Sequence, residues 1–319
     1  MELLVAGLVG FTMLVIFLVF LGSWYRARRR VRRYQKAGLL AGGVFLGLEV
    51  LILILLSLEN TQPPILFVLI LDVIGFIKIV AFTIMGVYFS AEIGLASFPL
   101  LMGNPQPANP LDAETDGELD GALGTASNTH AEASEEGDHE PMLQADEQEL
   151  PSAVQDPQHT TKAVELKEVC LATLCVVAAG GAYSAALFLL TRPTLSQAAK
   201  AVFGGNPDTS VSPSTLLAVA AIAFGEEIIF RLGIQNWFAY KCKWTGEKYW
   251  IAITLSTVIW TLAHVGTLEP EWVKLLQVFP FGIALGVLYK KYGAESAIAA
   301  HVLFNLILTP LGNYFINMQ

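Results

Sequence analysis

Three short segments near the C-terminal end of the chain hold ionisable and amide side chains within otherwise apolar sequence. They are Glu226-Glu227-x-x-x-Arg231, Trp260-x-x-x-His264 and His301-x-x-x-Asn305. A charged group inside a bilayer is costly and commonly marks a functional site. Carboxylates and imidazoles are also the side chains that most often transfer protons in catalysis. The combination therefore predicts an active site.

The surrounding sequence is typical of a polytopic helical membrane protein. Apolar residues make up 54% of the 319 residues, and apolar runs recur at roughly the 20 residues that span a bilayer. We expect an all-α fold with about eight transmembrane helices, at residues 3–24, 39–58, 65–89, 169–190, 213–237, 249–264, 273–289 and 296–315. This pattern excludes a soluble α/β enzyme.

Acidic residues divide the chain into three parts. Of the 28 Asp and Glu residues, 14 lie between Asp112 and Asp156, in a stretch with too little apolar surface to fold by itself. Residues 98–165 are therefore predicted to form a disordered acidic linker. It separates an N-terminal three-helix membrane unit, residues 1–97, from a five-helix membrane domain, residues 166–319. The net charge of −9 reflects this linker rather than the candidate site.

Basic residues predict the orientation in the membrane. The apolar run at residues 3–24 lacks a cleavage site and precedes an arginine-rich stretch, residues 26–36, which the positive-inside rule assigns to the cytosol. Met1 is then outside and the acidic linker is cytosolic. We expect an integral membrane protein, compatible with a bacterial inner membrane.

Helical geometry separates the two adjacent glutamates. Glu227 and Arg231 lie four residues apart on one face, with the acid first, the order that favours an ion pair. Glu226 points about 100° away and has no cation in register, which suits a general base. The alternative is a purely structural cluster of buried polar side chains between helices. Such a cluster explains the pair of Glu227 and Arg231 but not the additional carboxylate of Glu226.

The histidine motifs have both a structural and a catalytic interpretation. His264 follows Trp260 by one turn, so the indole and the imidazole share a helical face, although a histidine at a helix end is also common near a membrane interface. His301 and Asn305 share a face of the last helix. There they either hydrogen-bond to neighbouring helices or donate hydrogen bonds to an oxyanion.

The three motifs, in this order on successive membrane helices, resemble those of the CAAX-protease and bacteriocin-processing family, also called the ABI family. Its members are intramembrane glutamic endopeptidases. Residues 281–293, Phe-Gly-Ile-Ala-Leu-Gly-Val-Leu-Tyr-Lys-Lys-Tyr-Gly, are similar to the family's stretch before its last motif. The resemblance covers about residues 169–315, and Trp260 stands where the family usually has phenylalanine.

The resemblance implies a role for each motif. Glu226 would activate a water molecule for attack on a peptide carbonyl, assisted by His264. His301 and Asn305 would stabilise the tetrahedral oxyanion. The site would need neither a cofactor nor a metal ion.

Three further residues are expected to support the site. Glu227 and Arg231 would hold the catalytic helix in register, and Trp260 would form an aromatic wall. A zinc protease is the alternative mechanism, because two histidines and a glutamate can bind catalytic zinc. The H-E-x-x-H spacing that is typical of such enzymes is absent.

The expected activity is cleavage of a membrane-associated or lipid-anchored protein substrate. The expected partners are that substrate and membrane lipid, with no nucleic acid. The alternative is a non-catalytic membrane scaffold or bacteriocin-immunity protein on the same fold, because a fold does not dictate an activity.

Straight perpendicular helices would place His264 and His301 near opposite faces of the membrane, at about 1.5 Å per residue. The site could not assemble in that arrangement. We therefore expect residues 264–272 to dip into a cavity, with Glu269 near its mouth.

Overall fold

A computed structural model of the chain describes residues 34–59, 65–102, 166–197 and 211–317, with isolated residues between 15 and 25. Most of the predicted first helix, the arginine-rich stretch and most of the predicted linker lie outside the described residues. The described chain is helical apart from two very short strands, which confirms the all-α class.

The helices occur where the apolar runs predict them. The long ones are α2 (Gln35–Leu58), α3 (Ile65–Glu92), α6 (Leu166–Thr191), α8 (Pro213–Glu227), α10 (Tyr249–Leu262), α11 (Glu271–Tyr292) and α12 (Ala294–Asn317). The shorter elements are α4 (Pro99–Met102), β1 (Thr194–Leu195), the π-helix η2 (Ile228–Gln235), α9 (Asn236–Cys242), the 3-10 turn η3 (Gly246–Lys248) and β2 (Leu268–Glu269).

Five helical segments are long and apolar enough to cross a membrane: α2, residues 72–92 of α3, α6, α11 and residues 294–312 of α12. The chain is therefore an integral membrane protein. The total of eight spans and the orientation stay predictions.

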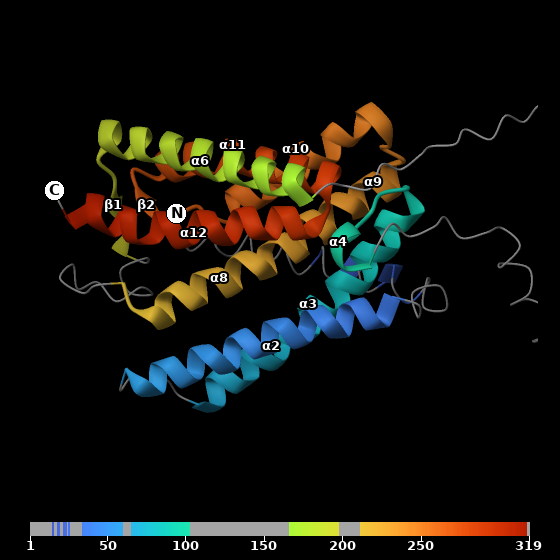
Figure 1. Ribbon diagram of the computed structural model, residues 1–319, viewed down its shortest axis with the longest axis horizontal. Coiled ribbons are helices and arrows are strands. Elements are labelled where there is room, and N and C mark those ends of the chain that lie inside the picture. Colours follow the sequence, from blue (N-terminus) through green and yellow to red (C-terminus); the bar gives the residue numbers. More distant parts are fainter. Residues whose placement is uncertain are drawn as a thin grey trace, which may run out of the picture. The chain divides into compact units, whose positions relative to one another are not determined.

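The helices that carry the three motifs form a closed ring. Around this ring, α8, η2, α10, α11 and α12 pack each against the next, and α12 packs against α8. Outside the ring, α6 packs on α11 and α12, while α2 and α3 pack on α8 and η2 (Figure 1). The three motifs consequently lie on helices of this ring, except that His264 follows the last residue of α10.

The start of α8 is fixed by capping groups. Ser212 is the N-cap and accepts a hydrogen bond from the backbone N–H of Thr215, and Pro213 occupies the first turn, where no N–H is needed. Glu59, at the end of α2, accepts hydrogen bonds from the hydroxyl of Ser214 at 2.6 Å and from its backbone N–H at 3.3 Å. These bonds lower the pKa of Glu59, so its carboxylate is suited to stabilising the N-terminus of α8.

The expected single helix over residues 213–237 is instead three consecutive helical segments. It changes from α-helix to π-helix immediately after Glu227 and returns to α-helix at Asn236. Such wide turns are frequent at functional sites. Ser256 of α10 donates a hydrogen bond to the Phe230 carbonyl at 2.7 Å, so a neighbouring helix satisfies a backbone group within the wide turn.

A glycine brings α3 against the π-helix. A Cβ atom on Gly86 would lie 2.5 Å from the Leu232 carbonyl oxygen, so any larger residue must displace backbone. We expect Gly86→Ala to lower the free energy of unfolding by about 1–3 kcal/mol, as over-packing does. Thermal unfolding of the purified protein in detergent measures this change.

Gly47→Ala is the matched control, because no atom lies within 4 Å of a Cβ added on that exposed face of α2. It should be neutral or stabilising by up to about 1 kcal/mol, since alanine favours the helix. Equal melting temperatures for the two variants would contradict the close approach of α3 to η2.

The connection from α11 to α12 is the single residue Gly293. Its φ of 85° is readily adopted only by glycine, and a Cβ there would collide with Pro99. The N–H of Ala294 donates to the Ser97 carbonyl at 2.7 Å. This tight turn holds α11 and α12 together at the end of the ring.

The segment between α10 and α11 is tied to the end of α6 by a two-stranded antiparallel sheet. Thr194 of β1 pairs with Glu269 of β2, and Leu195 pairs with Leu268. The backbone N–H of Ser196 also donates to the Thr267 carbonyl at 3.2 Å. Glu269 is exposed, and its position at a cavity mouth stays a prediction.

Candidate active site

Glu226 and Glu227 differ in exposure. The side chain of Glu226 is 24% exposed, whereas that of Glu227 is 1% exposed. The indole N–H of Trp260 donates a 2.8 Å hydrogen bond to Oε2 of Glu226. The arrangement leaves one accessible carboxylate, oriented by an indole, beside a buried one.

The buried carboxylate of Glu227 joins two helices. Its Oε1 lies 2.8 Å from Nδ1 of His301, and its Oε2 lies 3.4 Å from Nε of Arg231. The guanidinium of Arg231 is fully buried, donates to the Thr257 hydroxyl at 3.3 Å and lies 5.0 Å from the centre of the Trp260 ring. Glu227 therefore orients a histidine of α12 as well as pairing with Arg231.

The two ring nitrogens of His301 face the two glutamates. Because a carboxylate accepts hydrogen bonds, Nδ1 carries the proton that is shared with Glu227. Nε2 lies 3.8 Å from Oε2 of Glu226, which is beyond direct hydrogen-bond distance. A water molecule can contact both atoms from the side.

Trp260 also lies between the two histidines. Its ring is 4.9 Å from the ring of His264 and 5.4 Å from the ring of His301, both edge-on. Nδ1 of His264 donates to the Trp260 carbonyl at 2.9 Å, which leaves Nε2 as the acceptor of the neutral ring. Both imidazoles thus lie next to the same indole. His264 and His301 are therefore close to each other, and not near opposite faces of the membrane as straight perpendicular helices would require.

Asn305 is less closely associated with the other candidates. It lies one turn after His301 on α12, and its side-chain N–H donates to the Val219 carbonyl of α8 at 3.5 Å. Among the described contacts, none joins its amide to another predicted site residue. The structure brings together six of the predicted residues, Glu226, Glu227, Arg231, Trp260, His264 and His301, and leaves Asn305 at the edge.

Two features of the site were missed by sequence reasoning. Lys274 of α11 interacts electrostatically with Glu226 and with His264, whereas the sequence shows only that Glu226 has no cation in register on its own helix. A lysine close to a helix start resembles an interfacial residue in sequence, so no pattern singles it out. The indole N–H of Trp260 is a donor, whereas only an aromatic surface was expected.

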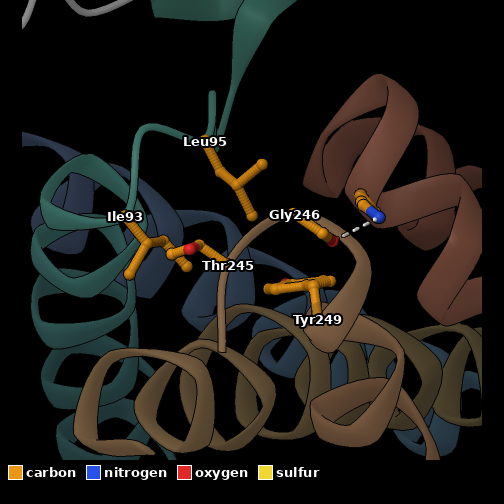
Figure 2. A pocket seen from close by; sticks show the side chains of 6 residues that line it. Ile93, Leu95, Thr245, Gly246 and Tyr249 are labelled. Atoms are coloured by element: carbon orange, nitrogen blue, oxygen red, sulfur yellow. Dashed lines mark hydrogen bonds between the residues drawn. The ribbon is translucent and has the colours of Figure 1, made fainter. Parts of the chain in front are cut away.

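No group of three or more His, Cys, Asp or Glu side chains in the described part of the chain is arranged to hold a metal ion. A cavity of ≈30 Å³ lies elsewhere, between the end of α3 and the loop before α10 (Figure 2). The ammonium of Lys290 donates to the Gly246 carbonyl beside it. This cavity has room for about one water molecule and includes none of the predicted site residues.

The donor role of Trp260 can be tested by Trp260→Phe, which keeps an aromatic ring but removes the N–H that contacts Glu226. Hydrogen bonds to charged groups contribute about 1.5–3 kcal/mol. We expect kcat/KM to fall by roughly 10-fold or more, and the melting temperature to fall as well, because the smaller ring leaves a gap at a fully buried position. Proteolysis of a peptide in detergent micelles measures the rate, and an unchanged rate would limit Trp260 to packing.

Comparisons with known proteins identify the segment that holds this site. Residues 209–307 match a family model described as type II CAAX prenyl endopeptidase Rce1-like. The chain is also similar to the sporulation-killing factor biosynthesis protein SkfC of Bacillus subtilis (strain 168), with 35% identity over 89 residues. That match spans 27% of this chain and 17% of the relative. No solved structure matches the chain.

All seven predicted site residues lie within residues 209–307. The resemblance seen in the three motifs is confirmed by both matches, and the matched family model describes an endopeptidase. The membrane segment that carries the candidate active site is therefore similar to the Rce1-like CAAX prenyl endopeptidases, in agreement with the resemblance of its three motifs to the CAAX-protease and bacteriocin-processing family.

Proposed function

We propose that the protein is an intramembrane endopeptidase in which Glu226 activates a water molecule. The observation that carries the proposal is the contrast between Glu226 and its surroundings. This carboxylate is partly exposed and oriented by Trp260, while the ion pair and histidine contact of Glu227 lie buried beside it. A purely structural polar cluster needs no accessible carboxylate of this kind.

Glu226 acts as the general base. A water molecule that contacts Glu226 Oε2 and His301 Nε2 gives one proton to the carboxylate as its oxygen attacks the peptide carbonyl carbon. His264, whose Nε2 is free to accept a hydrogen bond, orients this water. The carbonyl π electrons move to oxygen and form a tetrahedral oxyanion.

Collapse of this intermediate breaks the C–N bond. The departing amine takes the proton that Glu226 received, so the carboxylate is regenerated and one water molecule is consumed for each bond cleaved. The proton needs no external donor, because the same group serves as base and then as acid.

Asn305 and His301 stabilise the oxyanion in this proposal. The hydrogen bond from Asn305 to Val219 is 3.5 Å long, at the limit of the usual range, so exchanging it for a substrate oxygen costs little. His301 is held by Glu227 through its Nδ1–H, which fixes the direction of its second ring nitrogen. In this proposal the ring acts as the imidazolium, because only that form also carries a proton on Nε2 and can donate a hydrogen bond to the oxyanion.

The proposed substrate is a protein segment that is embedded in the membrane or anchored to it by lipid. The family description supports a prenylated peptide, whereas the name of the Bacillus relative links that protein to the biosynthesis of a sporulation-killing factor. The proposed orientation, with Met1 outside and the acidic linker in the cytosol of a bacterial cell, follows from the basic residues of the sequence.

Purified full-length protein in liposomes tests the activity. The assay uses quenched peptides of two kinds, one prenylated near its C-terminus and one with an apolar membrane segment, and compares wild type with His301→Ala. We expect cleavage of at least one peptide by wild type and loss of that cleavage in His301→Ala.

Equal turnover by both proteins would contradict the site, and absence of turnover by wild type would favour the scaffold alternative. Cleavage that chelators abolish and zinc restores would replace the glutamate mechanism with a metal mechanism. Chelator-resistant cleavage supports water activation by Glu226.

A further inference from the structure

One face of α11 carries polar groups toward the candidate active site. Lys274, Gln277 and Phe281 lie at i, i+3 and i+7 and therefore share a helical face. The Phe281 ring lies 5.8 Å from the ring of His301, which shows that this face points into the site. The polar pair occupies the first turns of α11, next to the segment that follows His264.

Lys274 and Gln277 contact each other and offer hydrogen-bond donors. The Lys274 ammonium donates to Oε1 of Gln277 at 3.1 Å. Gln277 is 1% exposed, and its side-chain N–H group has no hydrogen-bond partner among the described residues. A buried amide without a partner is costly, so this group is poised to donate to an acceptor that arrives with a ligand.

Ser184 of α6 adds a third donor at the same level. The Tyr183 hydroxyl donates to the Leu276 carbonyl at 3.1 Å, and Gly180 faces Phe281, so α6 and α11 run antiparallel in register. The Ser184 hydroxyl is buried and has no partner in the described part of the chain.

Lys274 forms no ion pair with a carboxylate in the described part of the chain. It does interact electrostatically with Glu226. A cation in a membrane protein interior usually pairs with an anion or marks a substrate path. A set made of an ammonium, an amide N–H and a hydroxyl favours a carboxylate, whose two oxygens only accept.

We propose that Lys274 and Gln277 form a subsite that binds a carboxylate of the substrate close to the scissile bond. The proposal rests on the proposed protease function. Because an extended peptide advances about 3.3 Å per residue, a carboxylate one to three residues from the reacting carbonyl lies within about 10 Å of Glu226. It is either the C-terminal carboxylate of the peptide or an Asp or Glu side chain.

Matched peptides test the subsite and distinguish the two sources. Three peptides share one sequence and one quenched reporter: the first ends in a free acid, the second in an amide, and the third in an amide with Asp replacing Asn two residues after the scissile bond. We expect wild type to cleave the acid, the Asp peptide or both at least about 10-fold better than the neutral peptide, mainly through KM.

The measured quantity is the ratio of kcat/KM for the acidic peptide to kcat/KM for the neutral peptide. Lys274→Met should bring this ratio close to 1, and Gln277→Leu should lower it. Lys274→Arg, which keeps the positive charge, should retain part of it. Lys291→Met is the control, because it removes an exposed lysine at the far end of the same helix and should keep the ratio. A ratio of 1 in wild type would overturn the proposal. So would an equal loss on all three peptides in Lys274→Met, which would indicate an action on Glu226 alone.

Peptide binding can be measured without cleavage, so it tests the subsite separately from the protease activity. Fluorescence anisotropy of the same peptides with Glu226→Gln protein, with and without Lys274→Met, reports affinity without cleavage. Discrimination that Lys274→Met removes supports the subsite even if wild type cleaves nothing, in which case only the protease proposal fails. Equal affinity for the acidic and neutral peptides overturns the subsite.

Discussion

Glu226→Gln is expected to lower kcat for peptide cleavage by at least about 10³-fold, within the range that general-base catalysis contributes. Glutamine has the shape of glutamate, and its carbonyl oxygen can still accept the hydrogen bond from Trp260. It cannot take a proton from water. The melting temperature should therefore stay nearly unchanged while the reaction stops.

Single-turnover cleavage in liposomes, with peptide affinity measured in parallel, separates this effect from a loss of binding. Glu247→Gln removes an exposed carboxylate in η3 and serves as the control, with activity equal to wild type. Retention of more than about a tenth of the activity by Glu226→Gln would rule out proton transfer to this residue as the main source of catalysis.

Breaking the buried charge pair should have the largest effect on stability. We expect Arg231→Met to lower the free energy of unfolding by about 3–5 kcal/mol, because it leaves the buried Glu227 carboxylate without its cation. The pair is already incompletely satisfied, since Nη2 of Arg231 has no hydrogen-bond partner among the described residues. Unfolding in mixed micelles at increasing denaturant measures the loss.

The double variant Glu227→Gln/Arg231→Met provides the matched comparison, because it removes both charges. It should be more stable than Arg231→Met alone, although His301 loses its charged acceptor and activity stays low. If Arg231→Met unfolds like wild type, the pair contributes little and Glu227 is held by His301 alone.

The sequence predicts the parts of this architecture that depend on local patterns. Apolar runs locate the helices to within a few residues, and i, i+4 spacing identifies the ion pair between Glu227 and Arg231. The different faces of Glu226 and Glu227 are reflected in their different exposure. These features follow from helical periodicity, which is a property of neighbouring residues.

Other parts depend on contacts between distant segments. The contact between Glu227 and His301 joins residues 74 positions apart, and no spacing rule reports it. The π-helix after Glu227 has the same apolar composition as an α-helix, so periodicity does not distinguish the two. The common depth of His264 and His301 depends on helix tilt, which interhelical packing determines. The proximity of Lys274 to Glu226 has the same tertiary origin.

The bond between Glu227 and His301 restricts how a substrate can enter. A membrane-embedded peptide can approach Glu226 from the side if two neighbouring helices part and form a lateral gate. Parting α8 from α12 would break this contact and leave Glu227 with Arg231 as its only partner, at the cost of one hydrogen bond to a charged group, about 1.5–3 kcal/mol. The seam between α8 and α12 is therefore expected to stay shut during turnover, and the gate is expected to open elsewhere around the helix ring.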